Sequence, residues 1–412
     1  MRILLWHGYL LGGTGSNVYT RALAGEWSRT GHEVVVVCQE RHADDLNLRG
    51  AEVVVPELPG GLLPVFVLDE YEGLHAKLLQ DFTRAELDAY VDANATALRE
   101  LLPADVVFAN HVLLGGAVGA ATGVPFAVKA HGSELEYSMR GNERLSRWGA
   151  EVLADARAVY VGSDHIRGVL EDVVGHVDRV REVPPGVDLD EFWPAPRELA
   201  LPLLIAASGR DQLDGGERHP DPGNAERFAE FFADDTPTIL YFGKLIENKG
   251  VQVLFEAMRG LHARAVVVGF GDYRATLEAL APPGTLFTGA LEHRHLVHLL
   301  PLVDVAVVPS IFPEAFGMVA AEAAAAGVPP VVADHSGLAE VAAGIAHEYP
   351  VDRRGLVSFP TGDGGALRQR LRTLLELPTA ERHELGLAAR AAVERNWSWA
   401  RVAERLLEPF TS

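Results

Sequence analysis

Short, unbroken runs of hydrophobic residues recur along this chain, and longer segments between them carry apolar residues every three or four positions. An unbroken apolar run is typical of a parallel strand buried on both faces, and the wider spacing is typical of a helix that covers a sheet. The expected strands are Val34–Cys38, Val106–Ala109, Phe126–Ala130, Ala158–Gly162, Ile239–Phe242, Ala265–Val268, Val303–Val308 and Pro330–Ala333. Segments such as Tyr19–Thr30 and Val251–Leu261 have the helical spacing. The alternation predicts an α/β fold with doubly wound parallel sheets.

The rhythm is interrupted near the middle of the chain, which predicts two domains. The stretch Val183-Pro184-Pro185-Gly186-Val187-Asp188 lacks the pattern, and residues 210–237 are rich in Asp, Gly, Glu and Pro. A length of 412 residues is more than one core usually needs. We expect a first Rossmann-like domain over residues 1–190, a second over 191–395, and an exposed loop near 208–224. Residues 396–412 are expected to form a terminal helix that packs back on the first domain, within a helical stretch spanning 391–410.

Composition excludes some classes of partner. The formal net charge of -21 argues against nucleic acid, whose binding depends on clustered Lys and Arg. Cys38 is the only cysteine, so no intrachain disulfide forms, and no metal site is expected. The apolar start Met1–Trp6 is too short for a signal peptide, and no apolar run is long enough to span a bilayer. A soluble cytoplasmic protein is expected; contact with a membrane is compatible with the sequence but not indicated by it.

The segment between Pro309 and Glu340 holds two carboxylates suited to a hydroxyl-bearing ligand. Glu314 and Glu322 lie on either side of Phe316-Gly317-Met318-Val319, and a helix rich in small residues follows. The free N–H groups and the dipole at a helix N-terminus favour an anion such as a phosphate. The other interpretation is an ordinary helix start, with Glu322 on a solvated face. This segment alone leaves both interpretations open.

A glycine-rich turn follows the first expected strand. It reads Gly12-Gly13-Thr14-Gly15-Ser16-Asn17-Val18-Tyr19 and leads into a helix, so its backbone could approach a phosphate or a sugar closely. A dinucleotide-binding fingerprint with Glu40 as the ribose acceptor is an alternative, weakened because Val18 stands in place of the third glycine. A purely structural turn is a further alternative.

Three histidines, His7, His111 and His131, come at the ends of expected strands. Ligands of open parallel sheets bind outside the carboxyl ends of the strands, so we expect the three rings at one edge. A single histidine at a strand end is more often structural, whereas three that converge favour a functional site.

Two further turns in the second half bear glycines. Gly243-Lys244-Leu245-Ile246-Glu247-Asn248-Lys249-Gly250 joins a strand to a helix, and its two lysines could clamp a diphosphate. Taken alone, such lysines are usually solvated. The turn Gly269-Phe270-Gly271 follows the next strand, where a nucleobase or ribose could lie, although Gly-x-Gly by itself is a weak signal.

In order and spacing these elements resemble the retaining glycosyltransferases of family 4. The resemblance extends from Gly12-Gly13 through His131-Gly132 and the Lys244/Lys249 turn to the Glu314-x7-Glu322 segment. The last of these is its most specific part. The resemblance as a whole implies the GT-B architecture, in which two Rossmann-like domains face each other across a cleft.

The resemblance implies a role for each matching position. Lys244 and Lys249 match the basic pair that grips the donor diphosphate, and Glu314 matches the residue that contacts hydroxyls of the donor sugar. Glu322 matches the residue bonded to the nucleotide ribose, and His131 lies near the reacting sugar. The four positions assigned to catalysis are His131, Glu314, Lys244 and Lys249. The positions assigned to the donor are Gly13, Gly15, Gly243, Gly269, Phe316, Gly317, Met318, Val319 and Glu322. The positions assigned to the acceptor are Asn17, Tyr19 and His111.

The implied reaction moves a hexose-type sugar from a nucleotide diphosphate sugar to an acceptor hydroxyl, with retention, by a front-face mechanism that uses no metal. No cofactor is expected beyond the donor substrate, and the acceptor is expected to be a small molecule, a glycan or a lipid-linked acceptor. The alternatives are a GT-B nucleotide-sugar epimerase or phosphorylase, or a binding protein that has lost turnover.

Overall fold

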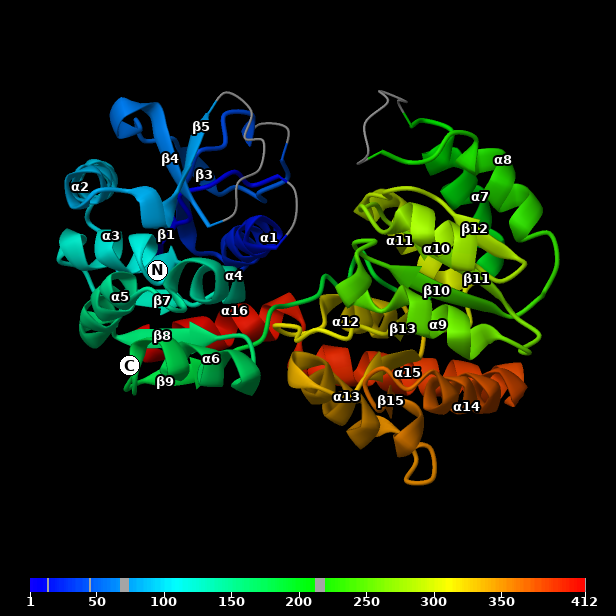
Figure 1. The fold of residues 1–412 in the computed structure, drawn as a ribbon. Coiled ribbons are helices and arrows are strands. Elements are labelled where there is room, and N and C mark those ends of the chain that lie inside the picture. Colours follow the sequence, from blue (N-terminus) through cyan, green and yellow to red (C-terminus); the bar gives the residue numbers. More distant parts are fainter. Residues whose placement is uncertain (13–14, 44–45, 67–73, 212–218, 412) are drawn as a thin grey trace. The chain divides into compact units, whose positions relative to one another are not determined.

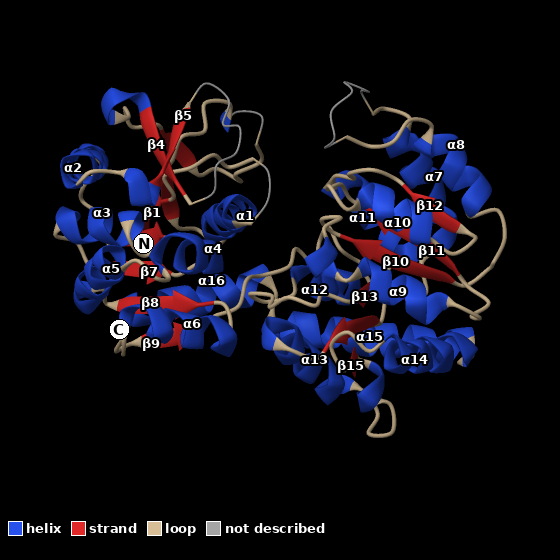
Figure 2. Ribbon diagram, viewed as in Figure 1, coloured by secondary structure: helices blue, strands red, loops and turns tan. Residues whose placement is uncertain are grey.

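The chain folds into two compact units, each with its own hydrophobic core. In the computed structural model, the described residues are 1–411 apart from 13–14, 44–45, 67–73 and 212–218. The first unit comprises Met1–Gly186 and Trp399–Ser412, and the second comprises Val187–Ser398. Each unit is built around a parallel sheet with helices on both faces (Figures 1 and 2). This is the doubly wound α/β fold that the hydrophobic pattern predicts.

The first unit has a seven-stranded sheet in the order β3-β2-β1-β6-β7-β8-β9. Its strands are β1 Arg2–Trp6, β2 Glu33–Val37, β3 Glu52–Val54, β6 Val106–Asn110, β7 Phe126–Lys129, β8 Ala158–Val161 and β9 Val180–Glu182. Its helices are α1 Ser16–Arg29, α2 Arg84–Glu100, α3 Leu114–Thr122, α4 Gly132–Glu134, α5 Glu143–Asp155, α6 Asp164–Val174 and α16 Trp399–Leu407. A separate parallel pair, β4 Leu62–Val65 and β5 His75–Leu78, lies beside them. All neighbouring strands of the large sheet run parallel.

Alternate residues of the central strand β1 belong to two different cores. Ile3 and Leu5 pack with side chains of α1 and α16, whereas Leu4 and Trp6 pack with side chains of α2, α3 and α5. Burial on both faces explains why the strands are apolar at every position rather than at every second one. The unbroken apolar runs in the sequence therefore record a sheet covered on both sides.

The second unit has a six-stranded parallel sheet in the order β12-β11-β10-β13-β14-β15. Its strands are β10 Thr238–Phe242, β11 Arg264–Val268, β12 Thr285–Phe287, β13 Val305–Val308, β14 Pro330–Ala333 and β15 Ser358–Phe359. Its helices are α7 Arg197–Ser208, α8 Asn224–Phe231, α9 Val251–Met258, α10 Arg274–Leu280, α11 His293–Leu299, α12 Met318–Ala325, α13 Ser336–Glu348, α14 Gly364–Glu376 and α15 Thr379–Asn396. Every strand that the sequence analysis expects is present in one of the two sheets, within two residues at each end. The expected loop near 208–224 lies between α7 and α8, and residues 212–218 of it are outside the described part.

The C-terminal stretch differs from the single helix that the sequence predicts. Helix α15 ends at Asn396, and α16 begins only at Trp399. The Trp397 ring packs edge-on against Phe316 in the second unit, with ring centroids 5.6 Å apart, whereas Trp399 packs against Tyr19 in the first at 5.3 Å. Because the two indoles belong to different cores, the helix breaks between them.

The junction near residue 186 lies just before the expected division after residue 190. Val187 and Phe192 are already buried in the core of the second unit, and the Val187 N–H donates to the Trp397 carbonyl at 2.7 Å. Contacts of this kind assign the connecting segment to the second unit.

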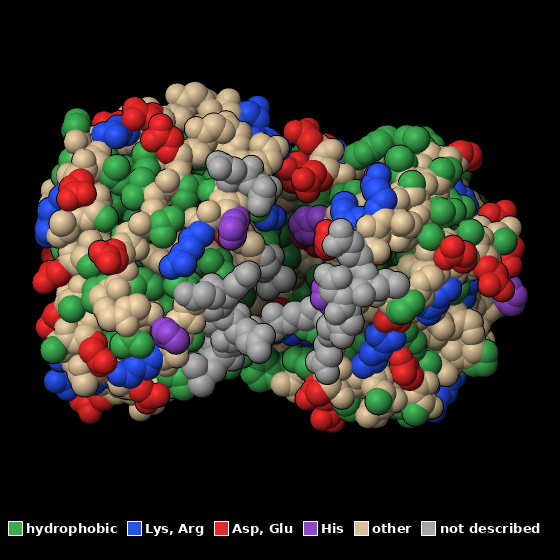
Figure 3. All heavy atoms as spheres, turned by 90° about the horizontal axis from the view of Figure 1, so that it is seen from above, with side chains coloured by type: hydrophobic (Ala, Val, Ile, Leu, Met, Phe, Trp, Pro, Cys, Tyr) green, Lys and Arg blue, Asp and Glu red, His purple; other side chains and the backbone are tan. Residues whose placement is uncertain are grey.

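No helix in the described part of the chain is long and apolar enough to cross a membrane. On the face shown in Figure 3, acidic and basic side chains are interspersed with hydrophobic ones, so the net negative charge does not gather there in one patch.

Candidate functional site

The predicted site residues form two clusters, one at the carboxyl edge of each sheet. In the second unit the central contact is an ion pair between the Lys249 Nζ and the Glu314 Oε1, which are 2.5 Å apart. Lys249 ends the short 3-10 turn Glu247–Lys249 before α9, and Glu314 lies in the loop between β13 and α12. Both side chains are half-buried. Nothing in the sequence links these two groups, and the structure places them in direct contact.

Backbone contacts fix the start of the Glu314 loop against the lysine turn. The Ser310 hydroxyl lies within hydrogen-bond distance of the carbonyls of Asn248 (3.2 Å) and Phe312 (3.0 Å), and the Ile311 N–H donates to Asn248. Gly250 has a φ of +71°, and a Cβ there would lie 1.9 Å from the Pro309 carbonyl oxygen. Only glycine permits this close approach, so Gly250 allows the lysine turn and the Glu314 loop to pack against each other.

The start of α13 holds the other side of the Glu314 loop. The Glu314 N–H donates to the Ser336 hydroxyl at 2.8 Å, and the Glu314 carbonyl accepts from the Gly337 N–H at 3.0 Å. His335 contributes a ring contact of 2.8 Å between its Nε2 and the Ser310 carbonyl. His335 and Ser336 were missed by the sequence analysis, because no spacing links them to Glu314.

Helix α12 begins directly after this loop. Its N-cap, Gly317, has a φ of +127°, and the Ala320 and Ala321 N–H groups donate back to the Gly317 carbonyl. The N–H groups of the first turn thus start at Met318 and Val319, where they are free of intrahelical partners. The Phe316 ring is buried against Trp397, and its backbone packs against Gly337, where a Cβ would lie 2.5 Å from the Phe316 Cα. Phe316 therefore shapes the loop from within, and the expected contact between Phe316 and the donor is not supported.

Glu322, on the second turn of α12, is a buried carboxylate and not a solvated one. It is 8% exposed, and burial raises its pKa to about 7, with the Glu191 carboxylate adding to the effect and His293 opposing it. The His293 Nε2 lies 3.8 Å from the Glu322 Oε1, and its Nδ1 lies 3.6 Å from Glu191. The interpretation of Glu322 as a surface residue is therefore wrong. His293 is a further neighbour of the site that the sequence did not single out.

The two glycine-bearing turns after β10 and β11 pack backbone against backbone. A Cβ on Gly269 would lie 1.8 Å from the Gly243 carbonyl oxygen, and the Leu245 N–H donates to the Phe270 carbonyl at 2.7 Å. The Tyr241 hydroxyl donates to the Lys244 carbonyl at 2.7 Å. Burial, then the charge of the Glu314 carboxylate, raises the pKa of Tyr241. The Lys244 side chain is exposed, so its ammonium group is accessible beside this packed turn.

In the first unit the three predicted histidines do lie together. His7 follows β1, His111 follows β6, and His131 comes two residues after β7, and these three strands are neighbours in the sheet. The His111 ring centroid is 5.9 Å from that of His7 and 4.9 Å from that of His131. The expectation that the three rings converge at one edge of the sheet is confirmed.

Amide side chains orient two of the histidines. The His7 Nε2 is 2.9 Å from the Asn17 Oδ1, and the Asn17 amide nitrogen donates to the Gly12 carbonyl. The His131 Nε2 is 2.9 Å from the Asn110 Oδ1. Asn17, a position assigned to the acceptor, thus lies in the cluster, and so does Asn110, the last residue of β6, which was not foreseen.

Burial keeps these rings neutral at pH 7. It lowers the pKa of His7 to about 4, against the effect of the Asn17 hydrogen bond. It also lowers the pKa of His111 and of His131, with His131 and His7 adding to the effect on His111, and Lys129 and His7 adding to that on His131. Neutral imidazoles offer one donor and one acceptor each, which suits the hydroxyl groups of a sugar or an acceptor.

Tyr19 has a different place from the one expected. It is 5% exposed and lies between the rings of His131 (5.5 Å) and Trp399 (5.3 Å), in the core of the first unit. Such packing argues against direct contact between Tyr19 and an acceptor. Gly15 is exposed with a φ of +65°, and Gly13 lies outside the described residues.

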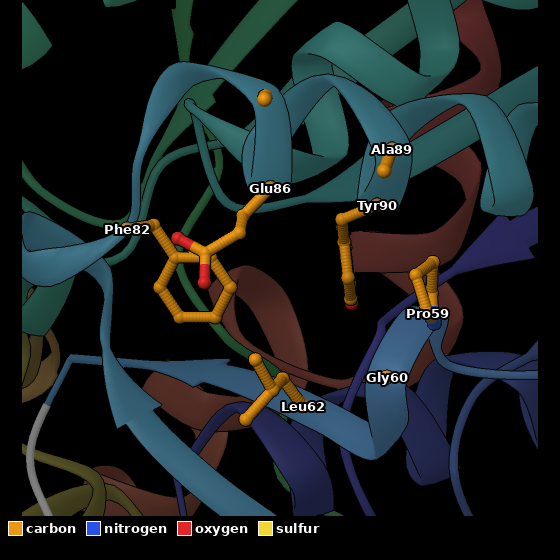
Figure 4. Close-up of a pocket in the computed structure, with 8 residues that line it drawn as sticks. Pro59, Gly60, Leu62, Phe82, Glu86, Ala89 and Tyr90 are labelled. Carbon is orange, nitrogen blue, oxygen red and sulfur yellow. The ribbon is translucent and has the colours of Figure 1, made fainter.

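A cavity of about 330 Å³ in the first unit is lined by none of these residues. It is formed by the segment around Pro59, by β4 and by α2, and Figure 4 shows Leu62, Phe82 and Tyr90 among its lining. Its lining is mainly apolar and shares no side chain with either cluster, so we do not place the chemistry there.

Two family models match this chain, one in each half. The model described as Glycosyltransferase Family 4 matches residues 13–191, and the one described as Glycosyl transferases group 1 matches residues 224–392. Both clusters lie inside these ranges apart from His7.

Relatives with assigned activities share part of the sequence. The GDP-mannose-dependent monoacylated alpha-(1-6)-phosphatidylinositol monomannoside mannosyltransferase of Corynebacterium glutamicum is 29% identical over 310 residues, 71% of this chain and 72% of the relative. The D-inositol 3-phosphate glycosyltransferase of Xylanimonas cellulosilytica is 32% identical over 245 residues, 57% of this chain and 51% of the relative.

Solved structures show the same fold at low sequence identity. Alr3699/HepE of Anabaena in complex with UDP and glucose superposes with a TM-score of 0.70 at 16% identity, covering 99% of each chain. Sucrose-phosphate synthase of Thermosynechococcus elongatus gives a TM-score of 0.66 at 20% identity, covering 98% of this chain and 97% of that one.

Proposed function

This chain belongs to the family 4 glycosyltransferases, with the GT-B fold that the resemblance implied, and we propose that it transfers a hexose from a nucleoside diphosphate sugar to an acceptor hydroxyl with retention. The observation that carries the proposal is the Lys249–Glu314 pair beside the N-terminus of α12. It joins a cation for phosphate, a carboxylate for sugar hydroxyls, and free N–H groups in one place.

Lys249 would hold the donor diphosphate, with Lys244 as the second cation. In the structure, Lys249 is already paired with Glu314, so a diphosphate would compete with that carboxylate for the ammonium group. The first-turn N–H groups at Met318 and Val319 would add hydrogen bonds and the helix dipole. Release of Glu314 from Lys249 would free its oxygens to accept from hydroxyls of the sugar.

Glu322 would accept from the hydroxyls of the ribose. Its burial excludes water from that contact, and such a hydrogen bond to a carboxylate is strengthened in a dry environment. The turns that contain Gly243 and Gly269 follow the neighbouring strands β10 and β11 at the same edge of the sheet, and a nucleotide would bind beside them.

Retention would follow from attack on the face from which the diphosphate leaves. The bond between the anomeric carbon and the diphosphate oxygen breaks, the acceptor oxygen bonds to the same carbon, and the acceptor proton passes to an oxygen of the leaving phosphate. The negative charge that develops on the diphosphate is what the lysines and the helix N-terminus would stabilise. His131 and its neighbours in the first unit would position the hydroxyl that reacts.

The names of the relatives suggest the first substrates to try. The corynebacterial relative is described as GDP-mannose-dependent and acts on a phosphatidylinositol monomannoside, and the Anabaena structure holds UDP and glucose. We therefore propose GDP-mannose and UDP-glucose as donors, and a polyol or lipid-linked glycoside as the acceptor.

Thermal stabilisation tests the donor site. The purified protein is heated with UDP, GDP, ADP or TDP, each with and without EDTA. Preferential stabilisation by one nucleotide, unchanged by EDTA, is expected and names the donor class; the matching nucleotide sugar then serves in a transfer assay with product anomers assigned by NMR. Stabilisation by none of the four, or a product of inverted configuration, would contradict the proposal.

A further inference from the structure

A buried carboxylate next to the histidine cluster has no part in the mechanism above. Glu134, in the short helix α4 (Gly132–Glu134) that follows His131, is 0% exposed. Its Oε2 accepts from the Val112 N–H at 2.6 Å, and its Oε1 accepts from the Leu113 N–H at 2.8 Å. Both oxygens therefore bind the turn after β6, so that Glu134 ties the turn after β7 to its neighbour.

The turn that Glu134 holds is a strained one. His111, directly before Val112, has a φ of +72°, a conformation that residues other than glycine rarely adopt. Such a conformation persists only where its surroundings enforce it. The His111 N–H donates to the Lys129 carbonyl, and the two bonds to Glu134 fix the residues that follow.

The constraint determines where the His111 ring lies. Its ring packs against those of His7, His131 and Phe66, and the carboxylate Oε2 is 3.9 Å from its Nδ1. In the described structure both ring nitrogens of His111 are buried and make no hydrogen bond. An unpaired buried polar group is costly, and it is found where a ligand or a functional constraint accounts for it.

On the basis of the proposed function, we infer that Glu134 is a positioning residue: its two hydrogen bonds hold the strained turn so that His111 and His131 are presented to the reacting hydroxyl. The carboxylate does not touch the substrate. It acts through the backbone of Val112 and Leu113, which it can hold with both oxygens only while it is ionised.

The charge state of Glu134 makes this role dependent on pH. Burial raises its pKa to about 7, against the effect of the two N–H bonds. Among the described residues, the titratable groups packed around Glu134 and the histidines are His7 and Tyr9 after β1, Tyr19 on α1, His111 after β6, and Lys129 and His131 at the end of β7. As the pH falls through 7, protonation of one oxygen would release one N–H and loosen the turn.

Glu134→Gln tests the inference, because the amide keeps the size of the side chain but replaces one acceptor by a donor that faces an N–H. With the nucleotide sugar that the parent enzyme uses, we expect kcat to fall about tenfold. The donor KM should stay within about twofold, because the side chains proposed to hold the donor diphosphate and ribose, Lys244, Lys249 and Glu322, belong to the second unit. The parent should lose kcat as the pH falls below 7, and the variant should show no such acid limb between pH 6 and 8.

The matched control is Glu26→Gln, which alters another buried carboxylate of the first unit that pairs with Arg29 and Arg49 and lies outside the histidine turns. It should keep the parent kcat and acid limb. A Glu134→Gln enzyme with the parent kcat and pH profile, or a kcat loss equalled by Glu26→Gln, would overturn the inference.

A stability measurement tests the same contact independently of turnover. His111→Gly relieves the backbone strain, so Glu134→Gln should lower the melting temperature less in that background than in the parent. Equal losses in both backgrounds would overturn the inference. If the parent transferred no sugar from any donor, the proposed function would fail, and this comparison would still decide whether Glu134 holds the turn.

Discussion

Replacing Gly269 by alanine should separate the two turns that form the floor of the proposed donor site. Gly269 has a φ of +143°, and an added Cβ would lie 1.8 Å from the Gly243 carbonyl oxygen, where ordinary contact begins near 3.4 Å. The turns must therefore move apart by about 1.6 Å, the difference between these two distances. A movement of that size breaks the 2.7 Å hydrogen bond between the Leu245 N–H and the Phe270 carbonyl.

Three contributions determine how much Gly269→Ala lowers the free energy of unfolding. A residue other than glycine in this backbone region costs about 1 to 3 kcal/mol, crowding in a packed region costs about 1 to 3 kcal/mol, and a lost hydrogen bond about 1 kcal/mol. Because relaxation of the turns relieves part of the strain and crowding together, we expect Gly269→Ala to lower the free energy of unfolding by about 3 to 5 kcal/mol.

Urea denaturation of the purified variant measures this cost, and nucleoside diphosphate titration of the still-folded protein measures the effect on binding. The control is Gly260→Ala in the same unit. Gly260 also has a positive φ, +80°, but nothing lies within 4 Å of a Cβ there. It should lose only about 1 to 2 kcal/mol and keep its nucleotide affinity.

The comparison separates collision from backbone strain. If Gly269→Ala were no less stable than Gly260→Ala, and bound nucleotide as the parent does, the close packing of the two turns would have no energetic consequence. The assignment of these turns to the donor site would then lose its physical basis.

Other contacts give further predictions. Lys249→Met and Glu314→Gln should not be additive: each should weaken nucleoside diphosphate binding or turnover alone, and a double-mutant cycle should show a coupling of about 1 kcal/mol, whereas strict additivity would mean that the ion pair plays no part. Glu322→Gln should reduce nucleotide affinity about tenfold, as measured by calorimetry, because one ribose acceptor is lost; an unchanged Kd would remove Glu322 from the site. The folded state should become less stable in acid, since His7 has a folded pKa of about 4 against 6.5 when unfolded, and the unfolded chain therefore binds more protons between these values. His7 therefore contributes a loss of about 2 kcal/mol in the free energy of unfolding between pH 7 and pH 5. In urea unfolding, the stability of His7→Gln should depend less steeply on pH than that of the parent. An unchanged pH dependence would show that His7 is not held neutral.

The class of fold and the order of its elements could be predicted from the pattern of apolar residues. Unbroken apolar runs identify strands buried on both faces, because a residue at each position must face one core or the other, as Ile3 and Leu4 do. Turns could also be recognised from the sequence, since Gly250, Gly269 and Gly317 occupy positions where the backbone has a positive φ. Each of these signals depends only on residues that are close together in the sequence, so it can be recognised without the structure.

The contacts between residues within the two clusters could not be predicted from the sequence and are visible only in the folded chain. Lys249 and Glu314 are 65 positions apart, and no spacing in the chain links them as partners. Three further features likewise depend on which loops meet at the carboxyl edge of the sheet. They are the burial of Glu322, the contact between the His335 ring and the Ser310 carbonyl, and the position of His293 beside Glu322. Tyr19 was assigned to an acceptor from its place in a glycine-rich turn, but the structure buries it against Trp399, which comes from the other end of the chain.

The break between α15 and α16 shows the same division. Helical spacing continues through Trp397 and Trp399, and local pattern therefore predicts one helix. The two indoles are buried in different cores, and the free energy of burying each is larger than the helix propensity of the two residues between α15 and α16. The spacing of apolar residues predicts that a residue is buried. It does not predict which residue packs against it, because that residue lies far away in the sequence and is brought close only by folding.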